Sequence, residues 1–288
     1  MNDVIRNEHV LEAVPAPSSG TTSAPVLVGE IDGLRTVFHA IAPGASLSPE
    51  YDEAEGRVFL FTSGQGWIET AGSIQQISEV TFYAPAHNTG FVIHAGRVED
   101  GGGEPAGAVS VDAASSHVDP PQQSPEPPAG QSTEPLRVLE LIIDLSATDQ
   151  EELQQVAARY PLFLSYADCK TYRERIKSDK TISRTLLPEH TFPRLCIGSV
   201  ETTGDDRVAA HEHPMLEQLF FGLTGNDCIV RADEAQFAFG EGVLLHIPLG
   251  SSHGVEVHAP KKLHYIWIDL FRDRQGMDWI VQEHITDP

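Results

Sequence analysis

The stretch HEHPMLE, residues 211–217, decides how this chain is interpreted. It places His213 two residues after His211, and Glu217 four residues further on. In an extended segment, residues two apart point to the same face, so all three side chains would point the same way. Imidazoles suit first-row transition metals, and a carboxylate adds charge and an oxygen donor. The segment therefore predicts three ligands of one divalent metal ion.

A second stretch, GVLLHIPLGSSH, residues 242–253, offers a fourth ligand. Pro248 and Gly250 favour a tight turn, after which His253 begins another strand. A neighbouring strand is where the missing ligand is needed. We therefore expect His253 to join the three residues of the first stretch.

Together, in this order and about one β-hairpin apart, the two stretches resemble the two sequence motifs of the cupin superfamily. Residues 211–217 are similar to HxH followed by three or four residues and Glu, and residues 242–253 are similar to G(x)5PxGxxH. The resemblance implies a double-stranded β-helix, or jelly-roll barrel. It also implies that His211, His213, Glu217 and His253 hold one Fe, Mn, Zn, Ni or Co ion. Two positions depart from the motifs. The glycine that often opens the first motif is displaced, with Gly204 one place off, and Val257 replaces the asparagine that often follows the last histidine. Neither is a ligand position.

The bulk composition limits the possible partners. The chain has 288 residues and a formal net charge of −23. An acidic surface repels phosphate backbones and anionic lipid heads, so we expect neither nucleic acid nor membrane partners. No apolar run approaches the roughly 18 residues of a membrane span, and residues 1–15 lack the apolar core of a signal peptide. We therefore expect a cytoplasmic protein.

Strand patterns occur in both halves of the chain, each with short apolar runs separated by turn residues. The run ending in an aromatic residue and glycine, followed about 20 residues later by a turn with proline, recurs in both halves, which predicts a tandem repeat. We expect an all-β fold of two cupin barrels with a short helical insert. The expected divisions are a flexible N-terminus 1–25, a first barrel 26–98, a linker 99–135 rich in Pro, Gly and Ser, and a metal-binding barrel 136–288. Residues 148–180 are expected to be helical, with Thr148 and Glu151 as a capping box.

The first barrel is expected to be degenerate. When Gly64 is matched to Gly225, the first-motif positions fall in PEYDEAEG, residues 49–56, which has acids but no histidine. When Pro85 is matched to Pro248, Gly90 takes the place of His253, and His87 lies nearby in another slot. We therefore expect this barrel to lack a transition metal and to serve packing, an interface or a lid.

Four segments also resemble two-barrel cupins that isomerise keto-deoxyuronates and deoxyglucuronate: residues 64–72, 82–95, 196–203 and 264–270. Those proteins have four residues between HxH and Glu, whereas this chain has three. The resemblance implies a ketol isomerase of a sugar acid, in which a metal chelates a carbonyl and its neighbouring hydroxyl and a base carries a proton across an enediol. His246, His264 and Tyr265 are the candidate acid–base groups.

A sugar acid also needs a cation. Residues 168–184 hold six of the 19 basic residues, and Lys170 and Arg173 are the candidate anchors. Phe221 is expected to line the cavity, and an apolar lining would favour the alternative, a dioxygenase acting on an enol or aromatic substrate. A non-catalytic metal- or sugar-binding module is the third possibility. In each case the partner is a small molecule, and exposed sheet edges favour a homodimer or higher homo-oligomer.

Overall fold

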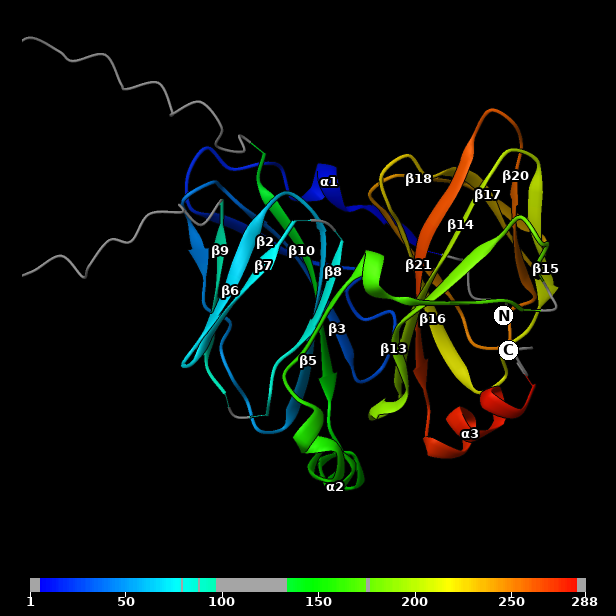
Figure 1. Cartoon of the computed structure of the whole chain (residues 1–288). Helices are drawn as coiled ribbons and strands as arrows, with labels where there is room; N and C mark the ends of the chain where they lie inside the picture. Colours follow the sequence, from blue (N-terminus) through cyan, green and yellow to red (C-terminus); the bar gives the residue numbers. More distant parts are fainter. Residues whose placement is uncertain (1–5, 79, 88, 97–133, 175–176, 284–288) are drawn as a thin grey trace, which may run out of the picture.

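The computed structural model describes residues 6–78, 80–87, 89–96, 134–174 and 177–283. Almost all of the expected linker, residues 99–135, lies outside the described residues. The described chain forms two barrels that lie side by side (Figure 1). Every strand pair between named strands is antiparallel. The prediction of an all-β fold built from tandem barrels is confirmed.

Each barrel consists of two sheets. The first barrel contains β2 (Thr21–Val26), β3 (Leu34–Ile41), β4 (Ser46–Leu47), β5 (Glu55–Ser63), β6 (Gly66–Thr70), β7 (Ser73–Ile77), β8 (Thr81–Ala84), β9 (Phe91–Ala95), β10 (Leu136–Asp144) and β11 (Leu162–Ser165). Its larger sheet has the order β11-β8-β5-β10-β3-β2, and its smaller sheet the order β4-β9-β6-β7.

The second barrel repeats this plan. It contains β1 (Asn7–His9), β12 (Lys170–Tyr172), β13 (Ile182–Phe192), β14 (Leu195–Thr203), β15 (Asp206–His211), β16 (Leu216–Gly222), β17 (Asp227–Ala232), β18 (Ala235–Gly240), β19 (Val243–Ile247), β20 (His253–Val257) and β21 (Lys262–Phe271). Its sheets have the orders β1-β19-β16-β21-β14-β13-β12 and β15-β20-β17-β18. Position by position, β8, β5, β10 and β3 therefore correspond to β19, β16, β21 and β14.

Strand β10 belongs to the first barrel, although it was expected to open the second. It pairs with β3 on one side and β5 on the other, as β21 pairs with β14 and β16. β11 also pairs with β8 of the first barrel. The expected boundary at residue 136 is therefore wrong, and the chain enters the second barrel after β11.

The N-terminal segment is part of the second barrel. β1 pairs with β19, and the Val10 amide donates to the Gly242 carbonyl at 2.9 Å. β2 then pairs with β3 in the first barrel. The expectation of a flexible segment 1–25 is therefore wrong from β1 onward. The physical reason is that an open sheet edge presents unpaired backbone groups, which β1 and β11 cover.

Helices are few in the described residues. They are α1 (Val10–Ala13), α2 (Ala147–Val156) and α3 (Arg274–Glu283), with single 3-10 turns η1 (Ala157–Arg159) and η2 (Tyr166–Asp168). The capping box of α2 is formed by Ser146 and Asp149, two residues before the expected pair. The stretch expected to be helical, 148–180, also contains β11 and β12, so that expectation holds only for its first turns. None of the helices described is long and apolar enough to cross a bilayer.

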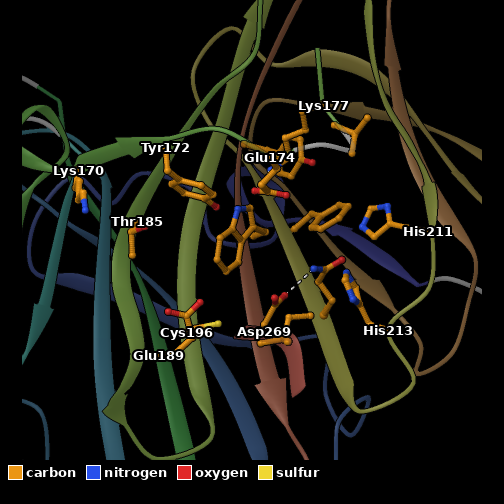
Figure 2. Close-up of a pocket in the computed structure, with 16 residues that line it drawn as sticks. Lys170, Tyr172, Glu174, Lys177, Thr185, Glu189, Cys196, His211, His213 and Asp269 are labelled. Carbon is orange, nitrogen blue, oxygen red and sulfur yellow. Dashed lines mark hydrogen bonds and ion pairs between the residues drawn. The ribbon is translucent and has the colours of Figure 1, made fainter. Parts of the chain in front are cut away.

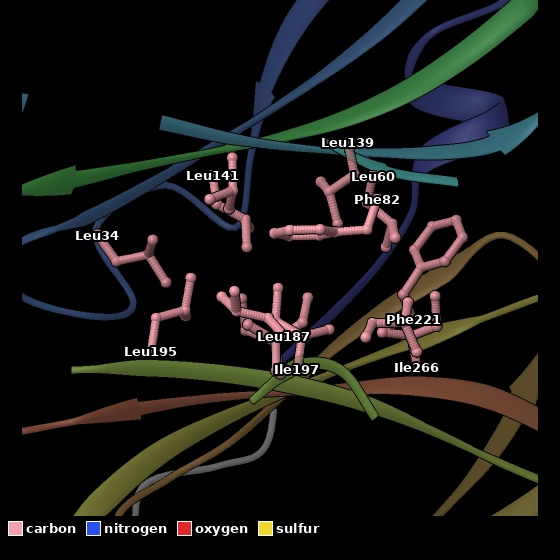
Figure 3. Close-up of a cluster of buried hydrophobic side chains, with 14 of the residues drawn as sticks. Leu34, Leu60, Phe82, Leu139, Leu141, Leu187, Leu195, Ile197, Phe221 and Ile266 are labelled. Carbon is pink, nitrogen blue, oxygen red and sulfur yellow. The ribbon is translucent and has the colours of Figure 1, made fainter. Parts of the chain in front are cut away.

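The main core lies between the two barrels. The larger sheets pack face to face, and leucine, isoleucine and phenylalanine side chains from both interdigitate (Figure 3). Leu60 and Leu139 belong to the first barrel, whereas Leu219, Phe221 and Ile266 belong to the second. A separate apolar cluster fills each barrel. Alternate residues of β16 therefore face two different cores, which decides where its side chains can act.

Candidate metal site

Three histidines gather at one end of the second barrel. His211 ends β15 and His253 begins β20, and the two are paired across the strands. His213 lies in the loop before β16. One ring nitrogen from each of the three lies within 4.8 Å of the others. A single ion can therefore contact all three, as the sequence predicts for these residues.

Hydrogen bonds at Nδ1 of His211 and of His253 leave the Nε2 atom of each ring available to a metal. Nδ1 of His211 donates to the Ala209 carbonyl at 2.8 Å, and Nδ1 of His253 donates to the Ser251 carbonyl at 3.0 Å. This fixes the tautomer that leaves Nε2 with a lone pair. Nε2 of His253 is buried and has no hydrogen-bond partner. Burial, with the nearby His211, lowers the pKa of His253 to about 4, so the ring is neutral near pH 7.

Glu217 does not join the histidines, so the prediction of this fourth ligand is wrong. Its Oε2 accepts hydrogen bonds from His246 Nε2 at 3.1 Å and from the Leu249 amide at 3.0 Å. Its neighbours of the same parity, Leu219 and Phe221, belong to the core between the barrels. The loop of residues 212–215 interrupts the strand. The alternation counted from His211 and His213 therefore cannot be continued to residue 217.

Gln218 takes the position that the sequence reasoning assigned to Glu217. Its Nε2 donates to Asp269 Oδ1 at 2.6 Å, and its Oε1 is buried with no hydrogen-bond partner (Figure 2, dashed line). A buried carbonyl oxygen without a donor costs free energy, and a cation removes that cost. The sequence signal was present, because Gln218 follows HxH after four residues and the resemblance had pointed to that spacing.

His211 and His213 open onto a cavity of about 400 Å³. Figure 2 shows His211 and His213 on one wall, with Lys177, Glu174 and Tyr172 facing the same space. Further side chains that line it are Lys170, Glu189, Cys196, Gln218, Phe220, Tyr265, Trp267 and Asp269. Of the residues predicted to be catalytic or to bind substrate, Tyr265 and Lys170 are therefore brought to the cavity.

Two predicted acid–base residues lie elsewhere. His246 faces the first barrel, with Nε2 on Glu217 and Nδ1 at 3.4 Å from Glu30. His264 is two residues from Ile266, which packs between the barrels, and its Nε2 lies 3.2 Å from the Tyr166 hydroxyl. Both expectations are wrong, because the two histidines occupy the outward face of their strands.

Two predicted substrate residues are also displaced from the cavity. Phe221 packs on Phe38 of the first barrel, with ring centroids 6.1 Å apart, and Phe220 lines the cavity in its place. Arg173 is exposed and pairs with Asp179 at 2.9 Å. On β16, the position that faces the cavity is therefore one residue before the predicted one.

Glu174 and Lys177 form a pair that the sequence reasoning missed. Both belong to the segment after β12, and Lys177 makes a backbone bridge with Val208 of β15. Lys177 Nζ donates to Glu174 and to the Ser183 hydroxyl at 3.2 Å. Burial lowers the pKa of Lys177, while the Glu174 carboxylate opposes that shift. This buried ion pair lines the same cavity as the histidines and is its most distinctive acid–base feature.

Tyr265 is not a base. It is almost fully buried, and burial raises its pKa well above the usual value. Its hydroxyl therefore stays protonated near pH 7 and can only donate or accept a hydrogen bond. Of the predicted acid–base residues, Tyr265 is the one that reaches the cavity, so the predicted roles need reassignment.

No family model matches the sequence, and no curated protein matches it either. Solved structures do match over almost the whole chain. A cupin 2 conserved barrel domain protein from Leptotrichia buccalis has a TM-score of 0.58 and 14% identity over 94% of this chain and 98% of its own. A putative glyoxylate-induced protein from Pseudomonas aeruginosa has a TM-score of 0.66 and 8% identity, covering 93% and 90%.

The oxalate decarboxylase of Bacillus subtilis has a TM-score of 0.60 and 12% identity, covering 95% of this chain and 77% of its own. The chain has the two-barrel cupin fold. At these identities the likeness concerns the fold alone. The cluster of His211, His213 and His253 fits one divalent metal ion.

Proposed function

We propose that this bicupin is a metal-dependent enzyme that isomerises a small hydroxy-keto acid by moving a proton between neighbouring carbons. The observation that carries the proposal is the cavity of the second barrel. It combines donor atoms for a metal, from His211, His213, His253 and Gln218, with the buried pair of Glu174 and Lys177. A homo-oligomer remains part of the proposal.

The charges around the cavity favour an acid as substrate. Two lysines and three carboxylates line it, which leaves one net negative charge. The proposed ligands are all neutral, so a divalent ion keeps its full charge and turns the balance to one net positive. Because opposite charges attract strongly away from bulk water, a monoanion is favoured only when the metal is bound.

The bound metal supplies Lewis-acid polarisation of the substrate's oxygen atoms. The chain's own residues supply the rest. We assign Glu174 as the proton acceptor, because a carboxylate can take a proton from a carbon next to a carbonyl and return it. Lys177 positions Glu174, and Lys170 at the cavity offers a cation for the substrate carboxylate. Asp269 accepts a hydrogen bond from the side-chain amide of Gln218 and so orients it, which leaves the Oε1 atom of Gln218 available as a metal ligand.

A dioxygenase acting on an enol or aromatic substrate is the second candidate. The observation in its favour is the aromatic part of the cavity wall, formed by Tyr172, Phe220, Tyr265 and Trp267. The third candidate is a non-catalytic metal- or sugar-binding module. It would use the same metal-binding atoms but would not need the ion pair of Glu174 and Lys177. Oxygen uptake and substrate turnover separate the three.

Metal content tests the ligand set. We expect one divalent ion per chain in the wild type and loss of most of it in His253→Ala and Gln218→Ala, measured by elemental analysis after dialysis. The matched control is Glu217→Gln, which changes the neighbouring side chain on the opposite face and is expected to keep its metal. Full occupancy in Gln218→Ala together with loss in Glu217→Gln would overturn the assignment.

Hydrogen exchange tests the reaction. In heavy water, the metal-loaded protein is expected to place deuterium on carbon in one of a panel of uronates, keto-sugar acids and small hydroxy-keto acids, followed by NMR. Glu174→Gln should lower the rate by about 100-fold or more, with metal content unchanged. The control Arg173→Ala alters an exposed cation of the same segment and should exchange normally. Oxygen consumption without exchange would instead support the dioxygenase.

A further inference from the structure

The first barrel has a cavity of its own, distinct from the metal site. It has a volume of about 140 Å³ and lies where β5 and the start of β9 meet α2 and the end of β13. Its side chains are mostly apolar: Pro49, Pro85, Phe91, Leu153, Ala157, Tyr160 and Phe192. The polar residues at it include Glu50, Tyr51, Arg57 and His87. Nothing in the proposed reaction uses this space.

Because the two barrels repeat one plan, this cavity can be compared position by position with the candidate metal site. β5 occupies the sheet position of β16, and Arg57 precedes Gly64 by seven residues as Gln218 precedes Gly225. Gly90 follows Pro85 by five residues, as His253 follows Pro248. Arg57 and Gly90 both line the small cavity. The cavity therefore takes the place in the first barrel that the candidate metal site takes in the second, with a guanidinium in the position of a metal donor.

The charge of Arg57 is already balanced. Its two terminal nitrogens donate to Glu140 Oε1 and Glu55 Oε2, both at 2.6 Å. Its third nitrogen, Nε, is buried and has no hydrogen-bond partner. With two carboxylates beside it and Glu50 at the cavity, a further anion gains little from this arginine. An uncharged oxygen acceptor, in contrast, satisfies the open N–H without adding negative charge.

The walls and the size define the rest of the ligand. Phe91, Tyr160 and Phe192 offer aromatic surfaces, and the Tyr51 hydroxyl lies 3.0 Å from the His87 ring nitrogens. An apolar cavity of about 150 Å³ holds one benzene molecule. The space therefore matches one six-membered ring with a short substituent.

We propose that the first barrel binds a small uncharged aromatic or cyclic carbonyl compound in this cavity, with Arg57 in place of a metal. The residues that close the cavity come from both barrels, because β13, which contributes Phe192, belongs to the second. Binding therefore stabilises the contact between the barrels, whatever reaction the second barrel performs.

The test uses the full chain and fluorine-labelled acetophenone, followed by fluorine NMR and calorimetry. We expect saturable binding at one site per chain. Gly90→Leu should weaken it by about tenfold or more, because Gly90 lines the cavity and a Cβ there meets no atom within 4 Å, which leaves room for a leucine side chain to occupy the ligand's space. Arg57→Met should also weaken it, and benzoate should bind more weakly than acetophenone.

His253→Ala serves as the matched control, since it removes the proposed metal but leaves the first barrel intact, and it should bind acetophenone as the wild type does. Unchanged binding in Gly90→Leu, or no saturable binding in the wild type, overturns the proposal. Tighter binding of benzoate overturns the ligand class. Because Gly90→Leu keeps the metal site, failure here is distinct from failure of the proposed isomerase.

Discussion

At the scale of single residues, one position separates the two barrels. Arg57 stands in the first where Gln218 stands in the second, and each is held by carboxylates: Arg57 by Glu55 and Glu140, Gln218 by Asp269. Glu140 also accepts from His39 Nε2 at 2.9 Å. The first barrel therefore carries a buried network of fixed charges, whereas the second keeps open donor atoms for an ion.

This network predicts a pH dependence of stability. Burial alone raises the pKa of Glu140, but His39 and Arg57 together outweigh burial and hold the pKa below its usual value of 4.5. A lowered carboxyl pKa stabilises the folded state above about pH 4.5, and this contribution is lost as the pH falls through the folded-state pKa. Glu140→Gln should cost about 3 kcal/mol near pH 7, because it leaves Arg57 and His39 without their anion.

Urea unfolding at a series of pH values measures this effect. The difference between wild type and Glu140→Gln should shrink as the pH falls below about 4, since Glu140 is then protonated in the wild type too. Asp52→Asn, an exposed carboxyl in the same barrel, is the control and should show little effect at any pH. A difference for Glu140→Gln that is the same at every pH would contradict the role given to its charge.

At the scale of elements, strand parity decides which side chains reach the cavity. β16 begins at Leu216, after a loop that breaks the alternation set by His211 and His213. Gln218 and Phe220 consequently face the barrel interior, while Glu217 and Phe221 face the other barrel. A motif read as one continuous strand is wrong by one residue here, and every inward-facing assignment on β16 shifts with it.

Strand pairing also decides where β10 belongs. β10 is mostly apolar because it is buried on both faces, between the interior of the first barrel and the core between barrels, and Glu140 is its buried charged residue. Its sequence does not say which barrel it completes. The barrel is decided by the place between β3 and β5, because without β10 neither of these two strands could pair its inner edge.

At the scale of the whole molecule, the contact between barrels is a single hydrophobic core. The face of β16 that carries Phe221 packs on the first barrel, and Phe38 is its aromatic partner. Each barrel alone would expose this apolar sheet face to water, which is unfavourable. The two barrels therefore form one folding unit, and their separate chemistry depends on the interiors rather than on this core.

A pair of neighbouring variants separates the two roles. Phe221→Ala should destabilise the chain by about 3–5 kcal/mol and leave the metal content unchanged, because the new cavity lies between the barrels. Phe220→Ala removes a ring that contacts the candidate site, 5.9 Å from the His253 ring, and should weaken metal binding. Thermal unfolding and metal titration of both variants measure this. Loss of metal in Phe221→Ala alone would contradict the assignment of faces.

The tandem β repeat and the gathering of three histidines follow from the local sequence, because the spacing of HxH and the Pro-Gly turn before His253 fix which strands they enter. The resemblance of these motifs to those of cupins implies the fold. Packing between elements places Gln218, rather than Glu217, at the cavity, brings Glu174 and Lys177 together there, and assigns β1 and β10 to their barrels. The reason is physical. Parity after a loop, the barrel that an apolar strand completes, and the meeting of segments far apart in the chain depend on packing between elements, which no single segment records.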